Sequence, residues 1–581
     1  MRVTAASAVL RARAIAGTYV VVLAWDFVPG QDAKKTGLMG FAIQREELKN
    51  GAVVERYWMT GIKRFKDKDK GLPPGTPVST AEHPVQSFQW ADYTAETDHT
   101  YRYQIVPVYG TVKMLQLDTA SAVTLEIATE LEYLLHLDKR NDEARHDVYF
   151  NRGVIGSQAY ARRFGNRMPD ADNPTAEEMV WLSRGLFEAL IKFIGLAEDH
   201  RFGLRAALYE FHYQPVANAF AKAVEAGADV KIVFDDEKTY KAANEAVIHN
   251  ARLDEMKVVI PRTVTEGIRH NKFIILLEDE KPIAVWTGST NISDGGLFGH
   301  SNVGHIVWSP TIAQTYLEYW TLLSQNLTPT KLRPKNRALT PLPAGRTQPN
   351  SVTPVFSARD AKDSSESLQW YADRMGEAQE ISCITLAFNL DKVFSKVIAQ
   401  DNDVLRYIVK DDDLGDGEII GRDRDVLFAA GGRLESGALA NFLAERDNPL
   451  NTNDYIHDKF MLVDPLGDDP LIVSGSANFS QPSQRINDEN MIVIRGDTRV
   501  ADIYFGEFMR IFDHHYARYV VKKLTDANRQ DPDAGYLKAN PEDLAAQPVQ
   551  RAELQSQAPE IFRRTVRTAT IPLLSSEQDP V

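Results

Sequence analysis

The sequence lacks the features that mark several classes of protein. It has one cysteine in 581 residues, Cys383, so neither a disulfide framework nor a thiolate metal site can form. Cys383 stands in the apolar run 381–386, which predicts a buried thiol on a strand. No stretch reaches the roughly 18 consecutive apolar residues of a membrane-spanning helix. These absences leave an ordinary globular chain.

Basic residues are scarce relative to acidic ones. The sequence has 66 Lys and Arg against 80 Asp and Glu, which gives a formal net charge of -14. Non-specific nucleic-acid binding is driven by many Lys and Arg side chains that neutralise phosphates, so this balance disfavours a dedicated nucleic-acid coat. A basic cleft in an acidic body is still compatible with it. The charge therefore ranks substrates and rejects none.

A cleavable signal is not evident near the start. Arg11 and Arg13 precede the apolar run 19–25, but that run is short and is followed by Asp26 instead of a small-residue cleavage site. The run is therefore predicted to be a first strand. A cytoplasmic location is the default expectation, although a chain exported without a cleaved signal would also lack a recognisable signal sequence.

The length predicts several folding units, since 581 residues are too many for one hydrophobic core. Residues 1–130 hold short runs rich in Val, Thr and aromatics, separated by Gly, Pro, Asn or Asp. Tyr101, Tyr103 and Ile105 alternate with polar residues, as in a half-buried strand. We predict a β-sandwich, and the spacing of Trp25, Trp90 and the Tyr-x-Tyr-x-Ile run resembles a fibronectin type III or immunoglobulin-like module.

The remaining chain alternates strand and helix patterns, which predicts an α/β fold with β-α-β units. Strands are predicted at 204–211 and 230–234, with an apolar helical stripe between them, and again at 381–388 and 404–409. Residues 328–354 hold six prolines and no apolar period, so they are predicted to be a linker running over the surface. The predicted parts are a first half at 131–327, the linker, a second half at 355–521 and a loosely packed polar tail at 522–581.

One pattern occurs once in each half: His-x-Lys, then Gly-Ser-x-Asn, with nineteen positions from lysine to asparagine. On a strand, residues two apart lie on one face. The glycine permits a tight turn that brings the asparagine back beside them. Since neither copy alone can hold and split a phosphodiester, the repeat predicts one shared site. Its members are His270, Lys272 and Asn291 in the first copy and His457, Lys459 and Asn478 in the second, 187 residues further on.

These residue types suit the cleavage of a phosphodiester. A neutral imidazole can attack phosphorus, and a second histidine can protonate the leaving oxygen. Two lysines and two asparagines can hold the non-bridging oxygens, which carry the negative charge of the five-coordinate state. Because these groups could do so without a metal ion, we expect no metal and no cofactor.

Both stretches resemble the HxK…GSxN signature of the phospholipase D superfamily, over roughly residues 140–520. The resemblance implies two pseudo-twofold related halves around one site and a phosphohistidine intermediate. Asp464 completes the second copy, and Glu489 lies where the family places a carboxylate that holds the histidine. In the first copy Leu277 replaces that aspartate. An offset of 188 then places Ser301-Asn302 opposite Glu489-Asn490.

This asymmetry predicts roles for the two histidines. A carboxylate of Glu489 against His457 would raise the pKa of His457 and keep it protonated, as a general acid requires. His270, with a neutral partner such as Ser301, would stay neutral and attack. We predict His270 as nucleophile and His457 as acid, and later as base for water. The converse assignment stays open, because a carboxylate can also orient a nucleophilic imidazole.

The predicted function is hydrolysis or transfer of phospholipid headgroup phosphodiesters. A nuclease of the same superfamily would use the same residues on DNA or RNA, and a non-catalytic homologue that binds phosphodiesters or proteins is a third hypothesis, motivated by Leu277 and Ser301. The acidic balance and the lack of an aromatic and basic stripe favour lipid, although no amphipathic membrane helix is evident. Nucleic acid, peripheral membrane contact and a protein partner of the N-terminal module stay open as partners.

Four further histidines have a simpler interpretation. His300 and His305 lie in a glycine-rich segment, which we interpret as a flexible rim loop over the first motif and not as a metal site. His514 and His515 lie on a predicted helix and are expected to be solvated.

Overall fold

The structure, a computed structural model, describes most of the chain from residue 1 to residue 541. The residues that it does not describe are 133–144, 238, 389, 401, 412–424, 436–438, 440, 449, 451–454, 527–534 and 542–581. Most of the segment predicted as a polar tail therefore lies outside the described residues.

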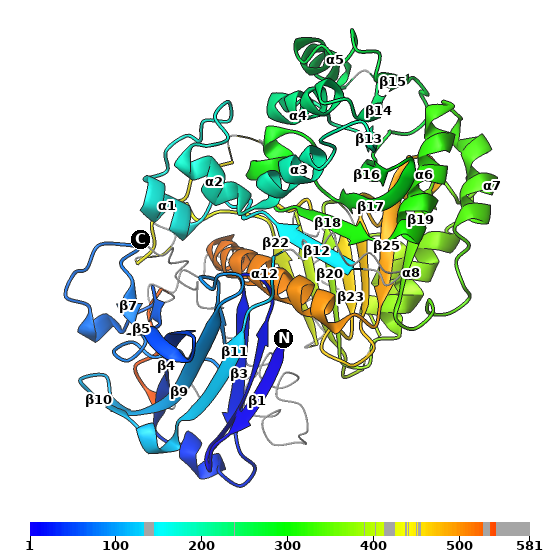
Figure 1. The fold of residues 1–581 in the computed structure, drawn as a ribbon. Helices are drawn as coiled ribbons and strands as arrows, with labels where there is room; N and C mark the ends of the chain where they lie inside the picture. The colour runs from blue at the N-terminus through cyan, green and yellow to red at the C-terminus, as the bar shows by residue number, and fades with distance from the viewer. Residues whose placement is uncertain are drawn as a thin grey trace.

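Two antiparallel sheets form the N-terminal part of the chain (Figure 1). Trp25, Trp90, Tyr101 and Tyr103 all lie in the one hydrophobic core that the two sheets share. Tyr101, Tyr103 and Ile105 are buried, so the predicted alternation is confirmed. The strands of the first sheet are, in order, β1 (Arg2–Ala6), β2 (Leu10–Ala16), β3 (Val21–Phe27) and β8 (Gln89–Asp92), and those of the second are β10 (Met114–Leu117), β9 (Thr100–Thr111), β4 (Leu38–Lys49) and β5 (Ala52–Trp58), with β11 (Val123–Ala128) also on β9 and a small pair of β6 (Thr60–Gly61) and β7 (Val78–Ser79) nearby.

Two seven-stranded mixed sheets follow, and their strand orders match position by position. In each sheet the three strands at one end of the order are parallel and the other neighbours are antiparallel. The predicted strands at 204–211, 230–234, 381–388 and 404–409 are confirmed, with ends shifted by up to three residues. The first order is β12 (Arg145–Phe150), β18 (Val303–Trp308), β17 (Lys281–Gly288), β16 (Lys272–Glu278), β13 (Phe202–Leu208), β14 (Asp229–Asp235) and β15 (Val259–Arg262), and the second is β19 (Ser351–Ser357), β25 (Glu489–Arg495), β24 (Leu471–Gly475), β23 (Phe460–Val463), β20 (Ile381–Leu386), β21 (Leu405–Lys410) and β22 (Val426–Ala430).

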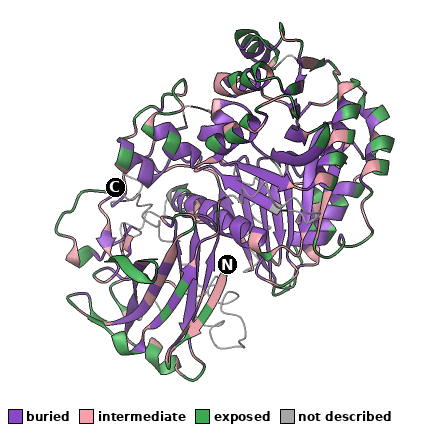
Figure 2. Ribbon diagram, in the orientation of Figure 1, coloured by how far each residue is buried: buried purple, intermediate pink, exposed green. Residues whose placement is uncertain are grey.

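Helices cover the outer faces of both sheets, and two long helices, α6 (Pro310–Ser324) and α12 (Thr498–Asp526), contact strands of both sheets (Figure 1). The burial pattern in Figure 2 follows from this, because the sheet strands are buried on both sides while the outer helices expose one face. The helices are α1 (Gln158–Phe164), α2 (Glu177–Ser183), α3 (Leu186–Gly195), α4 (Gln214–Glu225), α5 (Lys241–Asn250), α6 (Pro310–Ser324), α7 (Pro329–Leu339), α8 (Glu366–Gly376), α9 (Lys392–Ile398), α11 (Gln481–Arg485) and α12 (Thr498–Asp526), with short turns η1 (Asp32–Lys35), η2 (Lys66–Lys68), η3 (Thr119–Ser121) and η4 (Gly295–Gly299).

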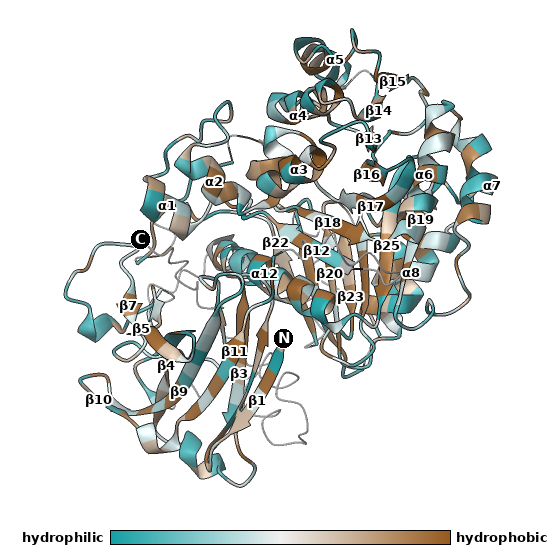
Figure 3. Cartoon of the chain, viewed as in Figure 1, coloured by the Kyte–Doolittle hydropathy of each residue, from teal (hydrophilic) through white to brown (hydrophobic). Residues whose placement is uncertain are grey.

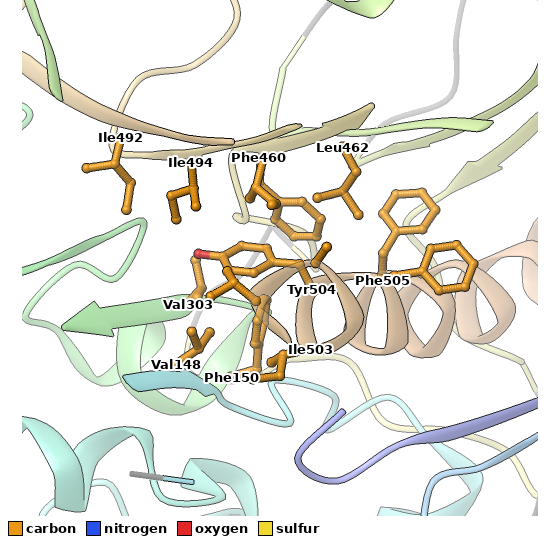
Figure 4. Close-up of a cluster of buried hydrophobic side chains, with 14 of the residues drawn as sticks. Val148, Phe150, Val303, Phe460, Leu462, Ile492, Ile494, Ile503, Tyr504 and Phe505 are labelled. Carbon is orange, nitrogen blue, oxygen red and sulfur yellow. The ribbon is translucent and has the colours of Figure 1, made fainter. Parts of the chain in front are cut away.

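The largest core joins the two sheets to each other. Alternate residues of one strand point to opposite sides: Phe273 and Ile275 belong to this core, whereas Ile274 belongs to the core under the outer helices. Figure 4 shows Val303 of the first sheet and Phe460 of the second on either side of the α12 ring of Tyr504, and Figure 3 shows apolar residues along the strands of both sheets. The apolar packing fixes the two motif-bearing sheets relative to each other.

The N-terminal module is attached to the same helix. Arg2 forms an ion pair with Asp502 of α12, with 2.7 Å between Nε and Oδ1. The hydroxyl of Tyr93 donates to Asp513 at 2.5 Å, and burial raises the pKa of Asp513 to about 7. The module therefore has polar as well as apolar contacts to the half that carries the second motif.

Two predictions about exposure are wrong. His514 and His515 lie on the predicted helix, α12, but both are buried, and burial holds their pKa values well below the usual range. The physical reason is that other parts of both halves cover this turn: His514 lies against the backbone of Gly156, and His515 lies against the backbone of Gly432 and the ring of Tyr455. Cys383 is buried on β20, as predicted.

The segment 328–354 is more structured than its composition suggested. It contains α7 and the first residues of β19. Pro329 occupies the first turn of the helix, where the missing N–H has no cost. Leu332 is buried, and the Asn336 side chain donates to the carbonyl of Ala358 at 2.9 Å. This connection is thus packed against the second half.

No helix among the described residues combines the length and the apolar composition that crossing a bilayer requires.

Candidate active site

The two copies of the motif occupy matching places in the two sheets. Lys272 is the first residue of β16, and Lys459 immediately precedes β23. Each asparagine follows the next strand, β17 or β24, which lies beside the lysine strand in its sheet. All six side chains are buried, with exposed fractions of 9% or less: His270, Lys272, Asn291, His457, Lys459 and Asn478.

Each histidine is held by a residue of the opposite half. The Nδ1 of His270 lies 2.8 Å from Oε2 of Glu489, and the Nδ1 of His457 lies 3.1 Å from Oδ1 of Asn302. The expected contact between Glu489 and His457 is therefore wrong. Ser301 does not hold His270 either, because its carbonyl accepts the backbone N–H of His457 at 3.2 Å.

Glu489 and Asn302 occupy equivalent positions in the two halves, which corrects the alignment predicted from the sequence. Gly288 pairs with Gly304 across β17 and β18, and Gly475 pairs with Met491 across β24 and β25, so the offset is still 187 at these strands. The extra residue lies further on, since one residue separates β18 from α6 and two separate β25 from α12. Asn302 is thus the counterpart of Glu489, and sequence reasoning missed its role.

The serines of the two Gly-Ser-x-Asn turns fix these partners. The hydroxyl of Ser476 donates to Oε2 of Glu489 at 2.7 Å, and that of Ser289 donates to Oδ1 of Asn302 at 2.8 Å. The amide of Asn302 also donates from Nδ2 to the carbonyl of Gly296 at 2.8 Å, which settles its orientation. Oδ1 then faces His457, so Nδ1 of that ring carries the proton and Nε2 is the nitrogen left for a substrate.

The glycine-rich segment before Asn302 is part of this support. We expected a flexible rim loop, but residues 295–299 form the buried turn η4. A Cβ on Gly296 would collide with the backbone of Asn291, so a larger side chain would displace the motif asparagine. His300 follows this turn, and its ring stacks on that of His457 with 4.5 Å between centroids. The segment is therefore a fixed wall of the site.

The site has an excess of positive charge at its centre. Lys272 donates from Nζ to the carbonyl of His270 at 2.7 Å, and Lys459 to that of His457 at 2.6 Å. Burial lowers the pKa of Lys272 to about 8. Burial, and after it the charge of Lys459, holds the pKa of His457 well below its usual range. Burial also lowers the pKa of His270, although Glu489 opposes the shift.

Both motif asparagines keep unused hydrogen-bonding capacity. The Oδ1 atoms of Asn291 and Asn478 are buried, and neither has a hydrogen-bond partner among the described residues. Buried polar groups are nearly always satisfied, so exceptions need an explanation. An unpaired amide oxygen can accept a hydrogen bond from a ligand or from water, while the two buried lysines beside these asparagines supply the positive charge that an anionic ligand requires.

Asp464 and Leu277 occupy a structural position, as expected. The carboxylate of Asp464 accepts backbone N–H groups from Gln379, Glu380 and Ile381, where β20 begins. In the first half Leu277 is buried in the central core instead. The difference concerns how a strand is anchored and lies away from both histidines.

Residues 190–321 and 419–514 match the family model described as "Cardiolipin synthase, PLD-like domain", and both copies of the motif lie inside these segments. No curated protein matches the chain.

Among solved structures, the chain is similar to phosphatidylserine synthase of Haemophilus influenzae Rd KW20, at 15% identity and a TM-score of 0.41, over 60% of this chain and 92% of that one. It is also similar to the phospholipase D family member Nuc of Salmonella typhimurium, at 22% identity and a TM-score of 0.22, over 32% and 96% of the two chains. Yeast tyrosyl-DNA phosphodiesterase matches at 13% identity and a TM-score of 0.31, over 53% and 87%. Residues 190–321 and 419–514 are thus similar to the phospholipase D-like domain of that family.

Proposed function

We propose that the protein is a phosphodiesterase that hydrolyses or transfers the headgroup of phospholipids through a phosphohistidine intermediate. The observation that carries the proposal is the crossed pair: each motif histidine has its Nδ1 bound by the opposite half, His270 by Glu489 and His457 by Asn302. With Nδ1 occupied, Nε2 of each ring is available for chemistry at one phosphorus. The non-catalytic hypothesis is disfavoured, since a mere binding site has no need of two oriented imidazoles.

His270 is the nucleophile in this proposal. When its Nε2 bonds to phosphorus the ring gains positive charge, and the adjacent carboxylate of Glu489 stabilises that charge. The sequence predicted the same nucleophile for a different reason, because it expected Glu489 to contact His457 and keep that histidine protonated. Glu489 contacts His270 instead. A carboxylate also favours protonation of the imidazole beside it, which would make His270 the acid. An experiment must therefore distinguish this assignment from its converse, in which His270 is the acid and His457 the nucleophile.

His457 is the acid. Its partner Asn302 is uncharged, and burial beside Lys459 keeps its affinity for protons low in the free protein. A bound phosphodiester brings a negative charge that raises the pKa of His457, so proton uptake accompanies substrate binding. An imidazolium without a carboxylate partner is also the stronger acid.

Two balanced steps follow. In the first, Nε2 of His270 bonds to phosphorus, the P–O bond to the leaving group breaks, and His457 gives its proton to that oxygen. In the second, His457 takes a proton from water or an acceptor alcohol, whose oxygen bonds to phosphorus while the P–N bond breaks. Lys272, Lys459 and the two motif asparagines hold the non-bridging oxygens throughout.

The test is an assay of the purified protein, with a chelator present, on mixed phospholipid vesicles and on single- and double-stranded DNA. We expect release of headgroup and phosphatidic acid, with DNA intact. His270→Ala should abolish this activity. His249→Ala is the matched control, because His249 is an exposed histidine of α5 and its loss should leave turnover unchanged. Cut DNA with intact lipid would make the protein a nuclease, and cleavage that survives in His270→Ala would overturn the proposed site.

A further inference from the structure

A small pocket opens beside the second copy of the motif. Its volume is about 200 Å³, including the part open to solvent. Phe479 forms a fixed wall, because its ring packs edge-on against Tyr371 and Phe394. Phe388 stands at the pocket with 58% of its surface exposed, which is unusual for a phenylalanine. The pocket lies between the residues that follow β20, among them Ala387 and Phe388, and the motif residues Lys459 and Asn478.

The same place in the first half is filled. Leu208 pairs with Lys272 between β13 and β16, and the register of β20 with β23 puts Leu386 opposite Lys459 in the same way. The residue after each leucine is therefore equivalent: Tyr209 in the first half and Ala387 in the second.

The tyrosine covers the first copy of the motif. The ring of Tyr209 lies 4.9 Å from that of His270 between centroids, and Nζ of Lys272 lies 5.2 Å from the centre of the tyrosine ring. Ala387 has no ring to place over Lys459, and the pocket occupies that space. A single difference in side-chain size thus leaves the second half open where the first is closed.

The next position differs in polarity. Glu210 accepts a hydrogen bond from Ser293 at 2.8 Å, so its carboxylate faces the first-half turn. Its equivalent is the exposed Phe388. One side of the shared site therefore presents a tyrosine and a carboxylate, and the other presents hydrocarbon.

We propose that Ala387 and Phe388 form an apolar subsite that receives a hydrocarbon substituent of the phosphodiester, with its phosphate on Lys459 and Asn478. The proposal rests on the proposed function and names the kind of substituent that this side of the site accepts. Leu386, Phe388 and Phe479 supply apolar surface, whose burial of hydrocarbon is favourable. Among the lining residues the positive charge comes from Lys459, which the reacting phosphate uses, so a second phosphate of a nucleic acid would meet no cation in this pocket.

The test uses chromogenic diesters that share a p-nitrophenyl leaving group and carry a methyl, butyl or octyl group, below their micelle concentrations. In the unmodified protein we expect kcat/KM to rise about tenfold from methyl to butyl, mainly through KM, as apolar surface is buried. Ala387→Tyr, which copies Tyr209, should remove most of this dependence. Phe388→Ser should weaken it and has a small risk of misfolding because Phe388 is exposed.

Met114→Ser is the matched control, since Met114 is an exposed apolar residue on the N-terminal module, 71% exposed. It should leave both the activity and the chain-length dependence unchanged. Hydrolysis of every diester at the same kcat/KM, or a dependence that survives both subsite variants, would overturn the subsite. A p-nitrophenyl ester of a nucleotide preferred over the octyl diester would overturn it as well. Failure to hydrolyse any diester would instead contradict the proposed function.

Discussion

The two halves of the site have the same strand order and the same motif but differ in the residue that reaches across to the other half's histidine. The second half offers Glu489, a carboxylate, and the first offers Asn302, an amide. Each is oriented by the serine of its own turn, so the geometry is matched while the charge is not. A repeated motif can thus hold two histidines in the same way and still give them partners of different charge.

The largest effect on turnover should come from removing the charge of Glu489, the residue of the second half that binds His270. Glu489→Gln keeps the shape and a hydrogen bond to His270 but leaves the positive charge of the phosphorylated ring without a counter-ion. We expect kcat to fall by about a hundredfold or more, as when a buried triad carboxylate becomes an amide. Steady-state kinetics should show this loss in kcat with little change in KM. A rise in KM with kcat unchanged would mean that Glu489 serves binding alone.

The reverse exchange should alter the pH dependence. Asn302→Asp places a carboxylate against His457 and should raise the pKa of that histidine. Because the acid must be protonated, kcat/KM falls as pH rises above this pKa, and the variant should keep its activity to higher pH by about one unit or more. The pH–rate profile of kcat/KM is the measurement. An alkaline limb that stays in place would show that the amide does not set the protonation of His457.

The smallest effect on turnover should come from the anchors away from the histidines. Asp464→Ala removes the acceptor of three backbone N–H groups and should lower the free energy of unfolding by about 1–3 kcal/mol. Leu277→Ala, at the corresponding position, should cost about 2–5 kcal/mol through a cavity. Denaturant unfolding checks both. Loss of kcat without loss of stability in either variant would give these residues a chemical role.

The repeat itself was readable from the sequence, because two equal spacings of histidine, lysine and asparagine are rare. The strands around it were also predictable from apolar runs. The crossed pairing was not, since Glu489 contacts a histidine 219 residues away and Asn302 contacts one 155 residues away. The one-residue shift placed after the asparagine in fact lies between β25 and α12, and this error made Ser301 look like the counterpart of Glu489.

Burial of polar residues was the other feature that sequence patterns did not reveal. His300, His514 and His515 are all buried, although histidines beside glycines or on a helix are usually interpreted as solvated. Their environment is set by residues far away in the chain, as where Gly156 lies against His514 and His457 stacks on His300. Tyr209 and Ala387 lacked any sequence signal, because their equivalence depends on the register of two different sheets.

Trapping the phosphorylated histidine would decide most directly which of the two rings attacks. A p-nitrophenyl diester needs no acid to leave, so a His457→Asn variant should form the covalent intermediate and, lacking the base for water, accumulate it. Rapid quenching and mass spectrometry should then find the phosphoryl group on a peptide that contains His270, and none in the His270→Asn variant. Phosphate on a peptide containing His457 in the His270→Asn variant, with none on His270 in the His457→Asn variant, would contradict the assignment and reverse the two roles.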